Sequence, residues 1–146
     1  FLPYIYSLAR EAHETGHPIV RPLLYEFQGD AKTYGILDEY MVGSGLLYAP
    51  QIYEGSRKVY LPKGKWADFW TCKVIEGPAW IESDEPYPMF IREGHLIPTE
   101  GEVRAFGSGR IALYDGSEVS YDGKTWKAPS GLKKTAINPD GSCKTS

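Results

Sequence analysis

The stretch Leu61-Pro-Lys-Gly-Lys-Trp-Ala-Asp-Phe-Trp70 decides how this chain folds, because it holds two strand-like runs joined by a Lys63-Gly64 turn. Similar short runs continue on both sides, separated by turn residues. The strand candidates are residues 46–53, 57–61, 65–70, 79–82, 87–92 and 95–98. Turn signals at intervals of roughly 8–12 residues are typical of an antiparallel sandwich or barrel rather than of βαβ units. The sequence therefore predicts a mostly β fold.

The residues before Gly45 follow a different pattern. Apolar residues recur there at helical spacing and predict a helix over 3–14, which Gly16 and Pro18 should end. Those apolar residues are Leu2, Ile5, Leu8, Ala9 and Ala12. The run 19–27 is nearly continuous in apolar character and indicates a buried strand of a parallel barrel, although Pro22 cannot donate to a central ladder. We expect a domain boundary near residues 40–45.

A third stretch begins near residue 100. Residues 110–114, 117–121 and 124–127 alternate weakly in hydropathy, and Asp115-Gly116 and Asp122-Gly123 join them. Asp-Gly between two such runs is a strong hairpin signal. After residue 128 the chain is rich in Pro, Gly, Ser and Lys, and we expect no closing element there. This stretch is predicted to be the start of a second β-domain, cut short.

Composition excludes several classes of function. The net charge of −3 argues against a nucleic-acid partner, which would need a basic face. No apolar run approaches the roughly 18 residues of a membrane helix, so no membrane partner is expected. Cys72 and Cys143 lie in different predicted segments, and we interpret them as two unrelated free thiols. That interpretation favours a cytoplasmic protein.

The stretch His13-Glu14-Thr15-Gly16-His17 matches the zinc-protease pattern H-E-x-x-H. That pattern works when one helical turn places both imidazoles on the same face. Here Gly16 stops the helix and the following proline disfavours helical geometry at His17. We interpret the match as fortuitous and assign no metal site.

Gly43-Ser44-Gly45 lacks the spaced glycines of a G-x-S-x-G nucleophile elbow. It is interpreted as a tight bend that enters a strand. No catalytic serine is assigned.

Carboxylate pairs are the natural candidates for glycoside hydrolysis. Asp38-Glu39 and Asp84-Glu85 are adjacent in sequence, and neighbouring side chains of an extended segment point to opposite faces. Glu26 and Asp30 are better placed, at the end of the barrel-like run. A structural role is still the preferred interpretation of both.

Four aromatic residues admit two interpretations. They pack in the core of a sandwich, or one or two of them form an exposed platform for a sugar ring. The group is Trp66, Phe69, Trp70 and Trp80. Core packing is the preferred interpretation.

Five blocks taken in order resemble glycoside hydrolase family 31, the α-glucosidase and α-xylosidase family. The resemblance covers residues 1 to about 98 and is strongest to the archaeal α-glucosidases. The blocks are F-L-P-Y-I-Y, V-R-P-L-L-Y-E-F, G-S-G-L-L-Y-A-P, L-P-K-G-K-W-A-D-F-W and P-M-F-I-R-E-G-H-L-I-P. The resemblance implies the end of a (β/α)8 barrel in residues 1–40, a proximal β-sandwich in 41–100, and the truncated start of a distal β-domain in 101–146.

The family hydrolyses terminal α-glycosidic bonds with retention, through an aspartate nucleophile and a second aspartate as the acid. The nucleophile lies in a W-x-D-M-N-E-like motif that does not occur in this sequence. We therefore assign no catalytic residue, cofactor site or metal site. The partners implied are the rest of the catalytic barrel and an α-linked oligosaccharide substrate.

Two hypotheses for this chain remain open. As a C-terminal fragment of such an enzyme, it would be inactive by itself and would support the barrel. As a stand-alone module, it would bind carbohydrate through an exposed Trp66 or Trp80, or serve a purely structural role.

Overall fold

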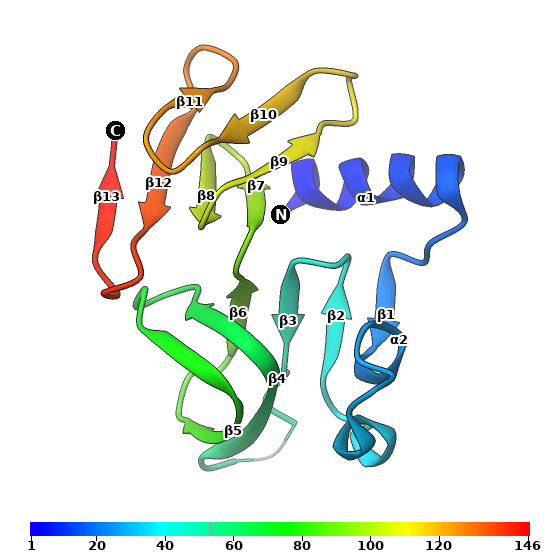
Figure 1. The fold of residues 1–146 in the computed structure, drawn as a ribbon. Helices are drawn as coiled ribbons and strands as arrows, with labels where there is room; N and C mark the ends of the chain where they lie inside the picture. The colour runs from blue at the N-terminus through cyan, green and yellow to red at the C-terminus, as the bar shows by residue number, and fades with distance from the viewer. Residues whose placement is uncertain (53) are drawn as a thin grey trace.

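A computed structural model describes residues 1–52 and 54–146. Within this part of the chain, one sheet has the strand order β1-β2-β3-β6-β4-β5, and every neighbouring pair is antiparallel (Figure 1). Its strands are β1 (Val20–Pro22), β2 (Tyr40–Val42), β3 (Leu46–Tyr48), β4 (Arg57–Asp68), β5 (Val74–Ser83) and β6 (Met89–Arg92). The prediction of a mostly β, antiparallel fold is confirmed.

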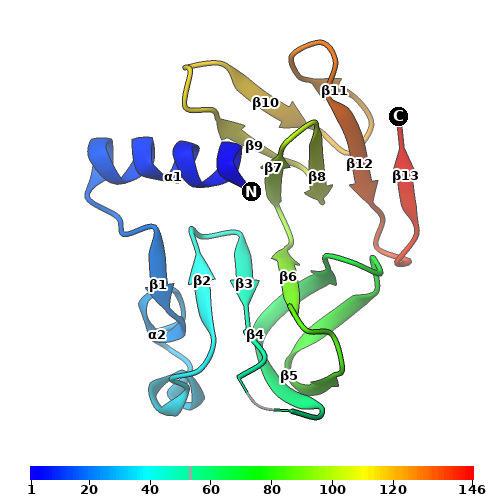
Figure 2. The same cartoon turned by 180° about the vertical axis from the view of Figure 1, so that it is seen from behind.

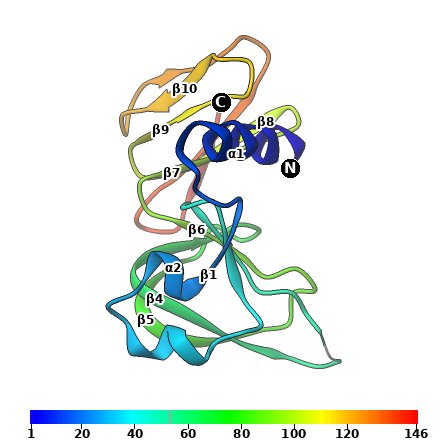
Figure 3. The same ribbon diagram turned by 90° about the vertical axis from the view of Figure 1, so that its right-hand side faces the viewer.

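The C-terminal part of the chain forms two more sheets: the sheet with β9 to β11 lies across α1 (Leu2–Thr15) from the first sheet, and the sheet with β7 and β8 lies beside the N-terminal end of α1 (Figures 2 and 3). One has the order β13-β12-β8-β7 and the other the order β11-β10-β9. The strands are β7 (His95–Thr99), β8 (Glu102–Phe106), β9 (Gly109–Ala112), β10 (Glu118–Tyr121), β11 (Trp126–Lys127), β12 (Lys133–Ile137) and β13 (Cys143–Thr145). Both predicted Asp-Gly hairpins are confirmed, because Gly116 and Gly123 take φ angles of 89° and 96° between paired strands.

Most predicted strands are confirmed, with shifted ends. The runs 57–61 and 65–70 form one strand, β4, whose register shifts between Leu61 and Gly64. The run 46–53 yields only β3, and Tyr53 lies outside the described residues. The division of the chain at residues 40 and 100 stays a prediction.

The predicted helix is confirmed as α1, and it packs directly on the turn between β2 and β3. Gly16 takes φ 80° and donates its N–H to the carbonyl of Ala12 at 2.9 Å, which ends the helix. The Tyr4 hydroxyl donates to the carbonyl of Val42 at 2.7 Å. A Cβ on Gly43 would lie 2.5 Å from Leu8 Cδ2, so only glycine allows this close approach.

The prediction of a parallel barrel strand over 19–27 is wrong for the described structure. Only Val20–Pro22 is extended, and it pairs antiparallel with β2 at the edge of the sheet. Helix α2 (Leu23–Glu26) follows at once, and the 3-10 helix η1 (Ala31–Gly35) comes next. Pro22 explains the short strand, because its missing N–H restricts it to a strand end or an edge.

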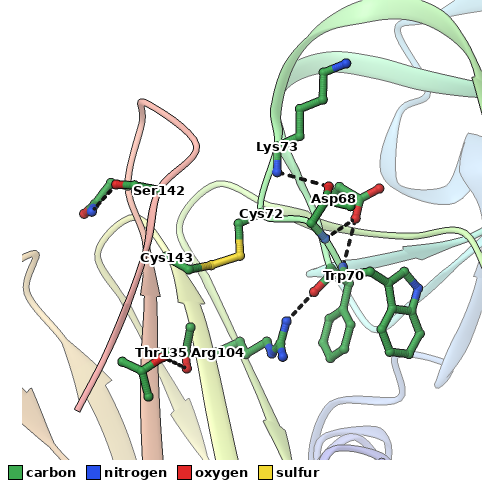
Figure 4. Close-up of a disulfide and its surroundings, with 12 residues drawn as sticks. Asp68, Trp70, Cys72, Lys73, Arg104, Thr135, Ser142 and Cys143 are labelled. Atoms are coloured by element: carbon green, nitrogen blue, oxygen red, sulfur yellow. Dashed lines mark hydrogen bonds between the residues drawn. A yellow bond between two sulfur atoms is a disulfide. The ribbon is translucent and has the colours of Figure 1, made fainter.

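The prediction of two free thiols and of an open C-terminal end is also wrong. Strand β12 pairs parallel with β8, and β13 folds back on β12. This return places Cys143 beside the turn after β4, where Cys143 forms a disulfide with Cys72 (Figure 4). Arg104 of β8 donates to the carbonyl of Phe69 in the same turn, and its guanidinium lies 4.5 Å from the Phe69 ring centroid.

One hydrophobic core joins the first sheet to the C-terminal sheets. It contains Tyr4 and Leu8 of the helix together with residues of both groups of strands, such as Ile91, Ile97 and Phe106. A second core lies under β4 and includes Trp66, which is fully buried and donates its indole N–H to the carbonyl of Pro62 at 2.8 Å. The third core lies among the C-terminal strands.

A buried carboxyl ties the start of β2 to β4. Glu39 is 2% exposed, and its Oε1 accepts the backbone N–H of Tyr60 at 2.9 Å. Its other oxygen, Oε2, has no hydrogen-bond partner among the described residues. Burial raises the pKa of Glu39 from 4.5 to about 7, against the opposing effects of the Tyr60 hydrogen bond and of Arg57.

Removing the disulfide is expected to lower stability. The bond joins residues separated by 71 positions, and closing a loop of this length is worth about 4 kcal/mol by the chain-entropy estimate. Urea unfolding with and without a thiol reductant measures the loss. A Cys72→Ser/Cys143→Ser double variant is the control, because reductant should leave it unchanged. Free thiols detected in the native, unreduced protein would contradict the disulfide.

Glu39→Gln is expected to stabilise the protein at neutral and alkaline pH. Below pH 4.5 both the folded and the unfolded chain hold the proton, whereas between pH 4.5 and about 7 the unfolded chain ionises first. Wild-type stability therefore falls through this window by about 3 kcal/mol, and the variant lacks that loss. Urea unfolding at several pH values measures both, with Glu85→Gln as the exposed control. A stability difference that does not grow with pH would count against this account.

Candidate functional site

The H-E-x-x-H residues do not converge. Helix α1 ends at Thr15, as the sequence predicts, so His17 lies beyond the helix and His13 remains on it. Nδ1 of His17 is 2.7 Å from the hydroxyl oxygen of Tyr25. Among the described residues, no group of three or more His, Cys, Asp or Glu side chains is arranged to hold a metal ion.

Glu26 belongs to a network of ion pairs around a buried arginine. Arg21 is 3% exposed and pairs with Glu26 at 2.7 Å and with Glu11 at 3.1 Å. Burial alone would lower the pKa of Arg21, but its hydrogen bonds to both carboxylates raise it above its ordinary value. Arg92 of β6 reaches Glu26 from the other side at 3.5 Å. The network connects α1, α2 and the central sheet, and Glu26 is thereby a structural residue.

Asp30 is also engaged in the fold. Its Oδ1 accepts the backbone N–H of Lys32 at 3.1 Å, which caps η1. Its Oδ2 accepts the hydroxyl of Tyr60 at 2.5 Å. Burial, together with this bond, raises the pKa of Tyr60 to about 12, so the phenol keeps its proton as the donor. Glu26 and Asp30 thus bind different partners.

The two adjacent carboxylate pairs diverge or lie in solvent. Asp38 is exposed and pairs with Arg57 at 3.1 Å, whereas Glu39 points into the protein. Asp84 and Glu85 are both exposed on the segment after β5.

Ser44 sits in the β2–β3 turn, which confirms the predicted bend. It lines a hollow of about 250 Å³ under α1 together with His95 and Glu11. Burial lowers the pKa of His95, and its Nδ1 is 3.2 Å from the carbonyl oxygen of Glu93. No hydrogen bond joins Ser44 to His95 in the described part of the chain, so the hollow does not hold an activated serine.

The four aromatic residues divide between the two interpretations. Trp66 and Phe69 are buried, as core packing predicts. Trp70 and Trp80 are 45% and 54% exposed. The exposed pair lies in different surroundings, so each is considered separately.

Trp70 belongs to an apolar groove that sequence reasoning did not find. The groove has a volume of about 340 Å³ and is lined almost entirely by apolar atoms from α1, β2, β3 and the turns beside them. Its lining residues are Phe1, Tyr4, Ile5, Val42, Leu46, Tyr48, Trp70, Tyr87 and Met89. The indole of Trp70 donates to the carbonyl of Tyr87 at 2.8 Å, which fixes one wall. No local signal marks this groove, because its walls come from segments more than 80 residues apart.

Within the described residues, no helix is long and apolar enough to cross a membrane.

Comparison with known proteins identifies the family. The model of the glycosyl hydrolase family 31 C-terminal domain matches residues 16–97. An α-glucosidase of Saccharolobus solfataricus is 51% identical over 122 residues, which are 82% of this chain and 18% of that protein. Alpha-glucosidase 2 of Bacillus thermoamyloliquefaciens is 44% identical over 109 residues, 71% of this chain and 14% of that protein.

A solved structure of the same family also resembles this chain. A family 31 dextranase from Flavobacterium johnsoniae superimposes with a TM-score of 0.72 at 26% identity, over 92% of this chain and 23% of that one. The chain therefore spans less than a quarter of the length of each of these three relatives. The resemblance drawn from the five sequence blocks is confirmed, and the chain belongs to glycosyl hydrolase family 31.

Proposed function

We propose that residues 1–146 are the C-terminal part of a retaining α-glycosidase that hydrolyses terminal α-glucosidic bonds in oligosaccharides. In this proposal the residues supply the accessory β-domains, and the catalytic aspartates lie in the preceding part of a longer chain, called the parent enzyme below. The observation that carries the proposal is that most of this chain matches a small part, 18% and 14%, of two α-glucosidases.

The disposition of the carboxylates supports an accessory role. Retaining hydrolysis requires two carboxyl groups roughly 5–5.5 Å apart that face each other across the scissile bond. Each acidic residue singled out in the sequence has another task or lies alone in solvent: Glu26 neutralises Arg21, Asp30 holds Tyr60, and Asp38 pairs with Arg57. The role of this chain is then to position and stabilise the barrel.

The apolar groove supports a barrel partner. Phe1 and Ile5 line the groove, so a chain segment that precedes Phe1 would start at its edge. Apolar surface of this kind is stabilised when another surface covers it and removes it from water. In the proposal, residues 1–40 belong to the end of the (β/α)8 barrel, and the barrel covers the groove.

A stand-alone carbohydrate-binding module is the second candidate. The exposed indole of Trp80 favours it, whereas Trp66, the other tryptophan considered for that role, is fully buried.

Activity assays separate these candidates. The 146-residue chain alone is expected not to hydrolyse p-nitrophenyl α-glucoside, because in this proposal the catalytic aspartates lie in the preceding part of the parent enzyme. The full natural chain that contains residues 1–146 is expected to hydrolyse it, with the α-anomer of glucose as the first product by NMR. Turnover by the 146-residue chain, or a β-anomer as the first product, would refute the proposal.

Charge placed in the groove is expected to destabilise the parent enzyme. Tyr87→Asp should lower its free energy of unfolding by about 1–3 kcal/mol, because the proposed barrel contact would remove the new carboxylate from water. Tyr34→Asp is the matched control, because Tyr34 and Tyr87 are both 58% exposed here and Tyr34 lies on η1, outside the groove. Thermal unfolding of both variants gives the comparison. Equal effects would mean that the barrel does not cover the groove.

A further inference from the structure

Trp80 stands on the outer face of the β4–β5 hairpin. It lies directly opposite Tyr60 in the strand register, and Lys58 lies opposite Glu82. Directly opposite residues of an antiparallel pair point to the same face, and so do residues two positions apart. The hairpin therefore presents Trp80, Lys58 and Glu82 together, and all three are exposed.

The indole rests on a rigid base. The Tyr60 ring is 1% exposed, and its centroid lies 5.0 Å from that of Trp80 at an interplanar angle of 46°. Tyr60 is itself fixed at both ends, because its backbone N–H is bound by Glu39 and its hydroxyl by Asp30. Tyr60 supports the indole from the buried side, and the rest of the Trp80 ring faces solvent. A ligand that stacks on Trp80 would thus meet a surface that is already ordered.

Two hollows flank this indole. One has a volume of about 350 Å³ and is lined by Trp80 together with Asp38, Gln51, Ser56 and a few neighbouring residues. The other, of about 500 Å³, lies between Trp80, Lys58 and Glu82. Lys58 and Trp80 line both hollows, so the two hollows adjoin at these side chains. An extended ligand fits this shape better than a single small molecule.

The first hollow has a mixed polar and apolar lining, and the second is mainly apolar, because Trp80 and Ile81 line it beside Lys58 and Glu82. A lysine faces a glutamate in one hollow, and Asp38 pairs with Arg57 in the other. Gln51 Oε1 and Arg57 Nε are buried and have no hydrogen-bond partner among the described residues, and both residues line the first hollow. Mixed donors and acceptors around an aromatic face suit a neutral polyhydroxylated ligand. A pyranose ring offers C–H groups for the indole and hydroxyls for the polar rim.

The Trp80 face is separate from the apolar groove. Strand β5 lies at the end of the molecule away from α1, whose first residues line the groove (Figures 1 and 3).

We infer that Trp80, with Lys58 and Glu82 beside it, forms a surface binding site for α-linked glucose oligosaccharides. The identity of the sugar rests on the proposed function. The site holds a long substrate on the enzyme surface.

The experiment uses the full natural chain that contains residues 1–146. Wild type, Trp80→Ala, Trp80→Phe and Tyr114→Ala are run in native gels that contain soluble starch, dextran or no polysaccharide. Tyr114 is a matched control, because it is 56% exposed but lies in the β9–β10 turn. Hydrolysis of p-nitrophenyl α-glucoside and elution volume on size exclusion are measured for each variant.

The expected result is that starch or dextran retards the wild type and Tyr114→Ala, and that Trp80→Ala weakens the apparent affinity roughly five- to tenfold. Trp80→Phe should retain part of it. All four proteins should hydrolyse the small substrate equally. Retardation without hydrolysis of any α-glycoside would remove the α-glycosidase assignment and leave the surface site standing.

Three outcomes would overturn the site. Unchanged migration of the wild type in both polysaccharides would mean that no such site exists. Trp80→Ala could be retarded as strongly as the wild type, which would place the binding elsewhere. Trp80→Ala could also alter the elution volume while retardation stays the same, which would make Trp80 a protein contact.

Discussion

The packing of α1 against the β2–β3 turn is the constraint on which the rest of the structure depends. Leu8 fills the space where Gly43 has no side chain, and the hydroxyl of Tyr4 binds the carbonyl of Val42. The same helix contributes to the core that also contains Ile97 and Phe106 of the C-terminal sheet. Without this contact the two groups of strands would share far less apolar surface, and burial of such surface is the main force that stabilises a fold.

The disulfide acts on the same junction from the other side. Cys143 comes from the last strand and Cys72 from the turn after β4, so the bond spans the boundary between the two groups of strands. Arg104 adds a second connection to the same turn through the carbonyl of Phe69. Helix α1 and the disulfide therefore limit the relative motion of the two groups, which is what a support for another domain requires.

Local signals in the sequence predicted the elements that local physics determines. Gly16 and Pro18 marked the end of α1, and the Asp-Gly pairs marked the hairpins at residues 115 and 122. The sequence did not predict the parallel pairing of β12 with β8, because these strands are about 30 residues apart and no turn joins them. The disulfide follows from that pairing, so it was missed for the same reason. The run 19–27 was misread because apolar character alone does not distinguish a buried strand from a short strand followed by a helical turn.

Residue type alone does not predict which ligand or partner an exposed side chain of the candidate sites would bind. Trp70 and Trp80 are the same residue type, and both are about half exposed. Trp70 is surrounded by Phe1, Tyr87 and other apolar side chains, whereas Trp80 has Lys58 and Glu82 beside it. An apolar surface displaces water from around Trp70 at little cost in free energy. Around Trp80, only a ligand that replaces the hydrogen bonds of the water can displace it without such a cost. The neighbours of each indole, brought together by the fold, thus support the proposals of a protein partner for Trp70 and of a sugar for Trp80.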